Sequence, residues 1–344
     1  MKAVVIHGPK DLRIEEREPS VAGPGEVEIA IEAGGICGSD LHYYNHGGFG
    51  AIRLKEPMIL GHEIAGTIKA LGVGVSGFAV GDRVAVSPSK PCNQCTYCLK
   101  GQQNQCLDMR FYGSAMRMPH IQGAFSQRLV ANHWQCHKVA DDVSINEAAF
   151  AEPFAVTLHA VNRTGSLLGK RVLVTGCGPI GTLCIVAARA HGAQEIVATD
   201  VMDGVLKMAL KAGADRVINV ADRPEDLAAY SANKGSFDVM FEASGNERGL
   251  RAGIDVLKPR GILMQLGLGG DISIPQNLIV SKELEIRGSF RFHEEFALAV
   301  DLINRKRVDL KPLLTGVYPI ADAVAAFEAA NDRSKSMKVQ LDFS

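Results

Sequence analysis

Four cysteines close together in the chain are the residues with the clearest chemistry. They are Cys92, Cys95, Cys98 and Cys106, all within fifteen residues. Thiolates at this spacing can converge on one tetrahedral Zn²⁺, which binds sulfur at about 2.3 Å. Because four thiolates leave no open position for a substrate, such a zinc ion would be structural and would hold a loop together. Two disulfides or an accidental cluster are the alternatives, and the spacing favours the metal.

A second set of possible metal ligands is spread over three segments. Cys37 lies in one, His62 and Glu63 in the next, and Glu152 in the third. One thiolate, one imidazole and one or two carboxylates can bind zinc and leave a position open for water or substrate. Each residue also has an ordinary interpretation, because a lone cysteine is usually a small core residue and lone acidic residues are usually solvated. Spacing alone therefore leaves this second site open.

A glycine motif lies between a predicted strand and a predicted helix. The residues expected to line this turn are Gly176, Gly178, Pro179, Ile180 and Gly181. In this context the motif indicates a dinucleotide site, with the pyrophosphate at the helix N-terminus; the alternative is a turn that only packs a helix. Asp200 follows nineteen residues after Gly181, where it would bind the adenosine ribose hydroxyls and repel a 2′-phosphate. No basic residue follows Asp200 directly, so NAD is favoured over NADP.

The elements that must position these residues change in character near residue 150. Before it, short alternating strands at residues 26–32, 64–68 and 82–86 predict a β-rich domain with long loops. After it, strands and helices alternate regularly. We expect strands at residues 171–175, 195–199, 216–220, 237–243, 261–266 and 284–288, helices at 180–190 and 205–212, and, beyond about 290, helices followed by a last strand at 338–341. Near-continuous apolar strands separated by helices predict a parallel sheet buried on both faces.

Length and composition agree with an ordinary two-domain enzyme. The chain has 344 residues, of which 47% are apolar and 22% charged, and its net charge is −1. This balance gives no electrostatic sign of nucleic-acid or membrane binding. No apolar stretch approaches the roughly 20 residues that span a bilayer, and the run before His7 is too short for a signal peptide. We therefore expect a cytoplasmic protein with reduced cysteines.

The segment from Gly61 to Gly72, with its His62-Glu63 pair and with Gly66, resembles the signature of the zinc-containing medium-chain alcohol dehydrogenases. The resemblance covers essentially the whole chain, and it is strongest to the polyol (sorbitol) dehydrogenase branch, because Ala151-Glu152-Pro153 stands where the alcohol dehydrogenases have their second zinc cysteine. It implies an α/β protein with a GroES-like catalytic domain, residues 1–148 and 290–344, around a Rossmann NAD-binding domain, residues 149–289. The active site would lie between the two domains.

The resemblance also implies roles for individual residues. The catalytic zinc ligands would be Cys37, His62, Glu63 and Glu152, with the choice between the two carboxylates left open. Ser39 would relay the proton of the bound alcohol, and His42 would pass it toward solvent. The implied cofactors are one catalytic zinc, one structural zinc and NAD. Val205 is a departure, because polyol dehydrogenases commonly carry a basic residue at this position, five after the ribose-binding acid.

The implied reaction is oxidation of a secondary alcohol of a sugar acid, such as L-idonate at C5. A carboxylate calls for a fixed cation, preferably an arginine. The candidates are Arg110, Arg117, Arg291 and Lys90, although each could be a surface charge and Arg291 could instead contact the cofactor or a hydroxyl. Possible pocket walls are Tyr43, Phe111 and Met116, which ordinary core packing would also explain.

Other functions remain open at this level. They are a sorbitol- or xylitol-type polyol dehydrogenase, an L-threonine dehydrogenase and a non-catalytic NAD-binding protein. The last is disfavoured, because such a protein has no need of the full set Cys37, Ser39, His42, His62, Glu63 and Glu152. The resemblance further implies a homodimer or homotetramer, for which the apolar segment Gly261–Ile274 could supply a sheet edge or could equally be a buried strand of the monomer.

Overall fold

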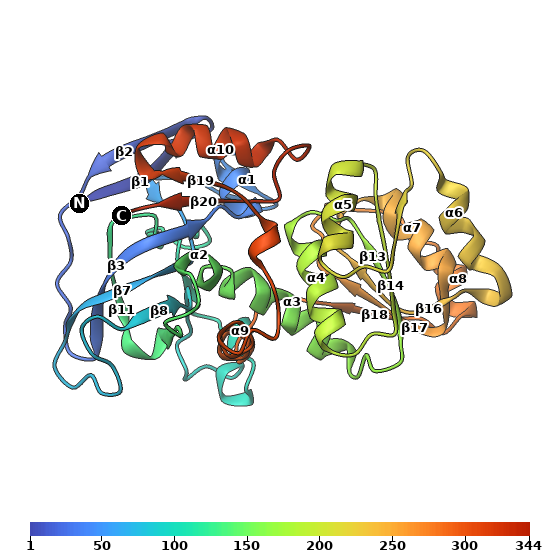
Figure 1. Ribbon diagram of the computed structural model, residues 1–344, viewed down its shortest axis with the longest axis horizontal. Helices are drawn as coiled ribbons and strands as arrows, with labels where there is room; N and C mark the ends of the chain where they lie inside the picture. Colours follow the sequence, from blue (N-terminus) through green and yellow to red (C-terminus); the bar gives the residue numbers. More distant parts are fainter.

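The computed structural model describes all residues, 1–344, and it has two lobes side by side (Figure 1). The chain builds most of the first lobe, crosses into the second, and returns to add its last strands to the first. Both termini therefore lie in the same lobe (Figure 1). No helix is both long enough and apolar enough to cross a membrane.

The first lobe is built on a seven-stranded, mostly antiparallel sheet with the order β12-β8-β7-β3-β20-β19, to which β11 adds by pairing with β3. Along β3, Val27, Ile29 and Ile31 are buried while the residues between them are half-buried, so one face of the strand packs into the core. The bounds are β3 (Glu26–Gly35), β7 (Glu63–Leu71), β8 (Arg83–Val86), β11 (Arg128–Asn132), β12 (Cys136–Lys138), β19 (Leu314–Pro319) and β20 (Lys338–Asp342).

Smaller elements complete this lobe. The short strands are β1 (Lys2–Gly8), β2 (Asp11–Glu16), β4 (Gly48–Phe49), β5 (Ile52–Arg53), β6 (Met58–Ile59), β9 (Ser89–Lys90) and β10 (Arg110–Phe111). The α-helices are α1 (Gly38–His46), α2 (Ile145–Ala148) and α10 (Ala323–Asn331). Short 3-10 helices are η1 (Cys98–Lys100), η2 (Gln103–Gln105), η3 (His133–Gln135), η5 (Lys311–Leu313) and η6 (Ile320–Asp322). Its aromatic centre includes Phe125 and Phe327, whose rings meet edge to face.

The second lobe is a six-stranded sheet in which all pairs are parallel, with the order β15-β14-β13-β16-β17-β18. In chain order this is 3-2-1-4-5-6, the doubly wound arrangement of dinucleotide-binding folds. The strands are β13 (Arg171–Thr175), β14 (Glu195–Asp200), β15 (Arg216–Asn219), β16 (Phe237–Glu242), β17 (Leu257–Gln265) and β18 (Glu285–Gly288). The helices are α4 (Pro179–Ala190), α5 (Asp203–Lys211), α6 (Pro224–Ala228), η4 (Ala229–Lys234), α7 (Glu247–Val256) and α8 (Gln276–Ser281).

Helices cover both faces of this sheet, as the sequence predicts. Val172 and Val174 of β13 point into the core that contains α4, whereas Leu173 between them points into the core that contains α7. A strand buried on both sides needs apolar residues at every position, which explains its continuous apolar pattern.

Two features go beyond the sequence-based expectation: an additional strand, and a choice for Gly261–Ile274 that the sequence left open. β19 was not predicted, because its residues are alternately half-buried and exposed and it contains both Gly316 and Pro319. β17 pairs with β16 on one side and β18 on the other, so residues 261–265 form an internal strand and β18 forms the sheet edge.

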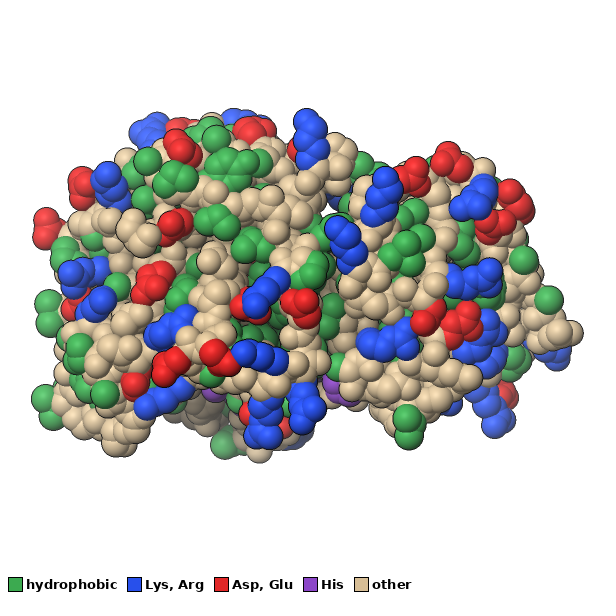
Figure 2. Space-filling view, viewed as in Figure 1, with side chains coloured by type: hydrophobic (Ala, Val, Ile, Leu, Met, Phe, Trp, Pro, Cys, Tyr) green, Lys and Arg blue, Asp and Glu red, His purple; other side chains and the backbone are tan.

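Helix α3 (Ala151–Thr164) lies where the two lobes meet (Figure 1). It packs against α4 of the second lobe, α9 (Glu295–Asn304) and β7 of the first lobe. Glu152 is in its first turn. Figure 2 shows acidic and basic side chains interspersed over this face of both lobes, without a patch of one sign.

Candidate active site and metal centres

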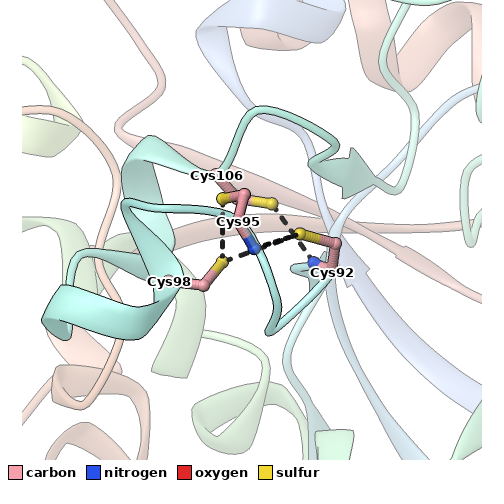
Figure 3. Close-up of side chains that lie close together, drawn as sticks. All are labelled: Cys92, Cys95, Cys98 and Cys106. Carbon is pink, nitrogen blue, oxygen red and sulfur yellow. Dashed lines mark hydrogen bonds between the residues drawn. The ribbon is translucent and has the colours of Figure 1, made fainter.

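The four clustered cysteines point toward one another in a loop of the first lobe (Figure 3). The sulfur atoms of Cys95 and Cys98 are 3.5 Å apart, and those of Cys92 and Cys98 are 4.0 Å apart. A tetrahedral zinc ion at about 2.3 Å from each sulfur would place the sulfur atoms about 3.8 Å from one another. All eight cysteines of the chain are free, so the disulfide alternative is not realised. The geometry and the donor set fit zinc.

Backbone N–H groups stabilise the thiolate form of these cysteines. The N–H of Cys95 donates to the sulfur of Cys92, and the N–H groups of Cys92 and Asp108 donate to that of Cys106. Hydrogen bonds from the backbone lower the pKa of Cys95 to about 6. Burial, together with the neighbouring thiols, raises the pKa of Cys98 to about 12, which a bound cation would reverse.

The second cluster brings Cys37, His62 and Glu63 together, with one ligand atom of each within 4.8 Å of the others. Cys37 is the residue before α1, and its position there is fixed by a hydrogen bond from its N–H to Asp40 Oδ2, 3.0 Å long. His62 and Glu63 stand at the start of β7, where Glu63 pairs with Gly35 of β3. A thiol, an imidazole and a carboxylate converging in a buried position fit a zinc ion with an open coordination site.

Asp40 lies behind the histidine of this cluster, a position that was not predicted from the sequence. Its carboxylate is fully buried, accepts a hydrogen bond from the N–H of Gly61, and lies 3.8 Å from His62 Nδ1. That nitrogen makes no hydrogen bond, and Asp40 lies near it as a charge beyond hydrogen-bonding distance. A carboxylate behind a metal-binding histidine fixes the ring so that its other nitrogen faces the metal. The position of Asp40 three residues after Cys37 was the available signal.

Glu63 is held by a buried lysine from the other end of the chain. Lys338 Nζ donates to both carboxylate oxygens of Glu63, at 2.8 and 2.7 Å, and both side chains are almost fully buried. Burial by itself would lower the pKa of Lys338, but the charge of Glu63 raises it. Gly35 makes room for the pair, since a Cβ there would lie 2.1 Å from Glu63 Oε2. Nothing in the sequence pattern pointed to Lys338.

Glu152 is buried beside the cluster without being part of the group within 4.8 Å. Burial, reinforced by the repulsion of Glu63 and opposed by His62, raises the pKa of Glu152 to about 8. Burial and the charge of Glu63 likewise raise the pKa of Cys37 to about 12. Several groups that repel one another's negative charge in a buried position are stabilised by a divalent cation.

Ser39 and His42 both lie on α1, beyond Cys37 toward its C-terminal end. Ser39 is half-buried, and His42 is exposed, with its ring 6.1 Å from that of His46 and 5.6 Å from that of Phe49. Burial, and to a smaller extent His46, lowers the pKa of His42. A histidine near solvent that stays neutral at pH 7 can accept a proton.

The glycine turn has the conformation that its motif requires. Gly176 has φ of 82°, and a Cβ at Gly181 would lie 1.7 Å from the carbonyl oxygen of Gly176. Gly178 is the residue before α4, so the helix N-terminus faces the turn. Asp200 is buried at the end of β14, where its carboxylate accepts hydrogen bonds from the N–H groups of Cys177 and Val201. Arg333 was not predicted here, yet its Nη2 approaches Gly178 from the first lobe.

Val205, where the polyol branch commonly has a basic residue, is buried in the core of the second lobe. Val205 lies on α5, and its apolar side chain faces this core. It therefore cannot replace the polar contact that a basic residue would make.

Among the four candidate cations, Arg291 is connected to the metal cluster through the ring of Phe111. Its guanidinium packs 4.2 Å from the centre of the Phe111 ring, which in turn lies 5.4 Å from the His62 ring. Burial lowers the pKa of Arg291 to about 10, against the attraction of Glu152 and Tyr43. Tyr43 itself is buried and accepts a hydrogen bond from the N–H of Ala115, as a core residue would. Met116 is exposed, and its sulfur lies 3.2 Å from Arg291 Nη2.

Of the other three cations, Arg117 lines the same cavity as Arg291, whereas Arg110 and Lys90 do not line it. Arg110 adjoins Phe111 in β10, so its exposed side chain points to the opposite side of the strand. Lys90 pairs with Arg110 across the strands and shares that side. Arg117 is used within its own loop, where it donates to two carbonyl oxygens and pairs with Asp108 at 2.6 Å.

Comparison with known proteins identifies the family. Residues 23–141 match the model of the alcohol dehydrogenase GroES-like domain, and residues 179–305 match that of the zinc-binding dehydrogenases. The chain is 40% identical to L-idonate 5-dehydrogenase (NAD(P)(+)) of Escherichia coli over 343 residues, which are 99% of this chain and 98% of that protein. The chain belongs to the zinc-containing medium-chain dehydrogenases.

Other relatives place this medium-chain dehydrogenase in the polyol branch. It is 35% identical to bovine sorbitol dehydrogenase, over 98% of this chain and 95% of that one, and 35% identical to D-xylulose reductase A of Aspergillus niger, over 94% and 92%. The crystal structure of the Escherichia coli L-idonate 5-dehydrogenase superposes with a TM-score of 0.95 at 39% identity, covering 99% of this chain and 97% of that one. The predicted family, α/β fold and cofactors are thereby confirmed: the protein is a zinc- and nicotinamide-dependent dehydrogenase of sugars or polyols.

Proposed function

We propose that this dehydrogenase oxidises the C5 hydroxyl of L-idonate to the ketone, giving 5-keto-D-gluconate, with NAD as hydride acceptor. The observation that carries the proposal is Arg291, a partly desolvated guanidinium that stacks on Phe111 and is attracted by the charge of Glu152. A cation in such a position can bind the carboxylate of a sugar acid through two parallel hydrogen bonds. The 40% identity to an L-idonate 5-dehydrogenase supports the same substrate.

The residues of the metal cluster would share the chemistry as follows. Cys37, His62 and a carboxylate from Glu63 or Glu152 would hold the catalytic zinc, whose bound charge lowers the pKa of a substrate hydroxyl while NAD accepts the hydride. Ser39 receives the hydroxyl proton, and His42 passes it to solvent. The raised pKa of Glu152 keeps its side chain largely protonated at neutral pH before the cation is bound, which limits repulsion within the site. The products are the ketone, NADH and one proton.

The preference for NAD over NADP rests on Asp200. Its buried carboxylate lies at the end of β14, where the adenosine ribose binds in this fold. A 2′-phosphate there would meet a like charge, and the following residues, Val201 and Met202, offer none of the opposite sign. The glycine turn from Gly176 to Gly181 would hold the pyrophosphate.

We further propose the division into a catalytic domain, residues 1–148 and 290–344, and an NAD-binding domain, residues 149–289. A cytoplasmic location is in keeping with eight free cysteines. The family resemblance favours a homodimer or homotetramer. The sheet edge available for continuation across a two-fold axis is β18, where Ile286 is 47% exposed.

Oxidation of a neutral polyol such as sorbitol or xylitol is the second candidate. It is favoured by the identity to sorbitol dehydrogenase and D-xylulose reductase, and Arg291 could donate to hydroxyl oxygens instead of a carboxylate. Both candidates use the same metal cluster, so only substrate specificity separates them.

The test is the initial rate of NAD⁺ reduction with L-idonate, sorbitol, xylitol, D-gluconate and L-threonine. Each substrate is measured with the unaltered enzyme, with Arg291→Ala and with Arg110→Ala as the control whose side chain points away. We expect L-idonate to have the highest kcat/KM and Arg291→Ala to remove that advantage, whereas Arg110→Ala keeps it. Sorbitol or xylitol equalling L-idonate in the unaltered enzyme would overturn the sugar-acid assignment.

A further inference from the structure

Arg291 sits in a loop whose conformation needs support from outside. The loop connects β18 to α9, and Arg291 has φ of 56°, in the left-handed region that a branched or long side chain rarely adopts. Such a residue persists only where its surroundings hold it. Because the guanidinium stacks on Phe111, a change of backbone conformation would move it off the ring.

The support comes from the cysteine loop. Asn104 lies in η2, between Cys98 and Cys106, and its side-chain Nδ2 donates to the carbonyl oxygen of Phe290 at 2.9 Å. Phe290 directly precedes Arg291. This hydrogen bond therefore connects the cysteine loop to the peptide group between Phe290 and Arg291.

Asn104 is itself held by a half-buried pair from two helices. Its Nδ2 lies 3.5 Å from His159 Nε2, and His159 Nδ1 lies 3.0 Å from Glu295 Oε1. Glu295 also accepts hydrogen bonds from Asn162 and from the N–H of His293, two residues after Arg291. Burial would raise the pKa of Glu295, but the hydrogen bonds from His159 and His293 hold it at about 2, so Glu295 is ionised at neutral pH.

A cavity of about 410 Å³ lies between the cysteine loop and Arg291. Its walls include Cys106, Leu107, Met116, Arg117 and Arg291, of which Arg117 is already paired with Asp108. The cysteine loop thus forms one side of the space that Arg291 faces, in addition to fixing the peptide before it.

We propose that Asn104 and the His159–Glu295 pair are positioning residues for Arg291, so that the structural-zinc loop sets the affinity for the acid group of the substrate. The proposal rests on the proposed function, in which Arg291 binds that acid group. Asn104 keeps the peptide of Phe290 in place, the pair keeps Asn104 and the start of α9 in place, and the guanidinium stays over Phe111.

The first experiment replaces Asn104 by Asp, which keeps the shape of the side chain and removes the donated N–H. With L-idonate, we expect KM and the dissociation constant from the NADH complex to rise about three- to tenfold, as for the loss of one hydrogen bond. kcat, the KM for NAD⁺ and the zinc content should stay unchanged. Gln105→Ala, an exposed residue of the same 3-10 turn, is the matched control and should have no effect.

A double-mutant cycle with Arg291→Ala tests whether Asn104 acts through Arg291. The two effects on KM should not add, because once the guanidinium is gone there is nothing left to position. Glu295→Gln gives a second, independent variant, which should raise KM for L-idonate and leave that for NAD⁺ unchanged. Additive effects, or a loss of thermal stability without any selective change in KM, would overturn the positioning role while leaving the function intact. If Arg291→Ala leaves KM for L-idonate unchanged, the sugar-acid function fails and this proposal fails with it.

Discussion

The two cysteine-containing centres are assembled in opposite ways. The closed centre takes all four ligands from residues 92–106, and the amides that stabilise its thiols come from residues 92–108. The open centre takes Cys37 from the turn between β3 and α1, His62 and Glu63 from the point where β7 begins, and its supporting Lys338 from β20. One centre is a product of local chain geometry, whereas the other is a product of strand pairing.

Sheet register explains how distant residues meet in the open centre. Gly35 pairs with Glu63 on one side of β3 and with Gln340 of β20 on the other. Lys338 stands two residues before Gln340, which places its amine over Glu63. A shift of one residue in either pairing would turn these side chains to the other face. The open centre therefore depends on the whole sheet, and the closed centre depends on one loop.

The largest effect is expected from Cys37→Ala. Removing a ligand of the open centre takes away the positive charge that stabilises the developing alkoxide, so kcat/KM should fall at least about 10³-fold. Cys184→Ala, a buried thiol of α4 outside both centres, is the control and should keep normal activity. Steady-state rates with NAD⁺ measure the effect. Activity retained by Cys37→Ala would remove Cys37 from the proposed ligand set.

Cys95→Ala should act on stability more than on the chemical step. Losing a ligand of the closed centre should cost one zinc ion per chain and on the order of 4 kcal/mol in free energy of unfolding. The remaining folded protein should keep kcat but bind L-idonate less tightly, because the loop carries Asn104. Metal analysis and thermal unfolding check this. An unchanged melting temperature together with a collapsed kcat would reverse the distinction between the two centres.

Lys338→Met should destabilise the protein by about 3 kcal/mol, because it leaves the carboxylate of Glu63 buried without its partner. The matched control is Lys10→Met, which breaks an ion pair whose two side chains are each 52% exposed and should cost less than about 1 kcal/mol. Urea unfolding of both variants measures the difference. Adding Glu63→Gln to Lys338→Met should recover part of the loss, and equal costs for Lys338 and Lys10 would show that burial of the pair is unimportant.

The smallest effect concerns the pH dependence of oxidation. Burial and His46 lower the pKa of His42, so His42 becomes an acceptor below the ordinary histidine range, and activity should rise as pH increases through that pKa. His46→Ala removes a neighbouring positive charge, which lets His42 hold its proton to higher pH. The rising limb of kcat/KM against pH should then move upward by a few tenths of a unit, at the scale of exposed charge pairs. His133→Ala, in the distant η3, should leave the profile in place, and a downward shift for His46→Ala would contradict the relay role.

The features that could be predicted from the sequence are those that local chain geometry encodes. The spacing of four cysteines, the glycine turn between a strand and a helix, and the acid at the end of β14 each involve residues whose separation is fixed by a short loop or by one strand–helix unit. Alternation of apolar strands and helices gave the parallel sheet for the same reason. Family resemblance, in turn, supplied the assignment of Cys37, His62 and Glu63 to one site.

The contacts between distant segments could not be predicted from the sequence and are seen only in the folded protein. Lys338 meets Glu63 across 275 residues, and Asn104 meets Phe290 across 186, and no periodicity connects such positions. Four cations were candidates in the sequence, with Arg110 and Arg291 preferred. In the structure the alternation of β10 turns Arg110 away, whereas Arg291 lies over Phe111. The physical reason is that these contacts follow from sheet register and from the packing of two lobes, which depend on the folded chain as a whole.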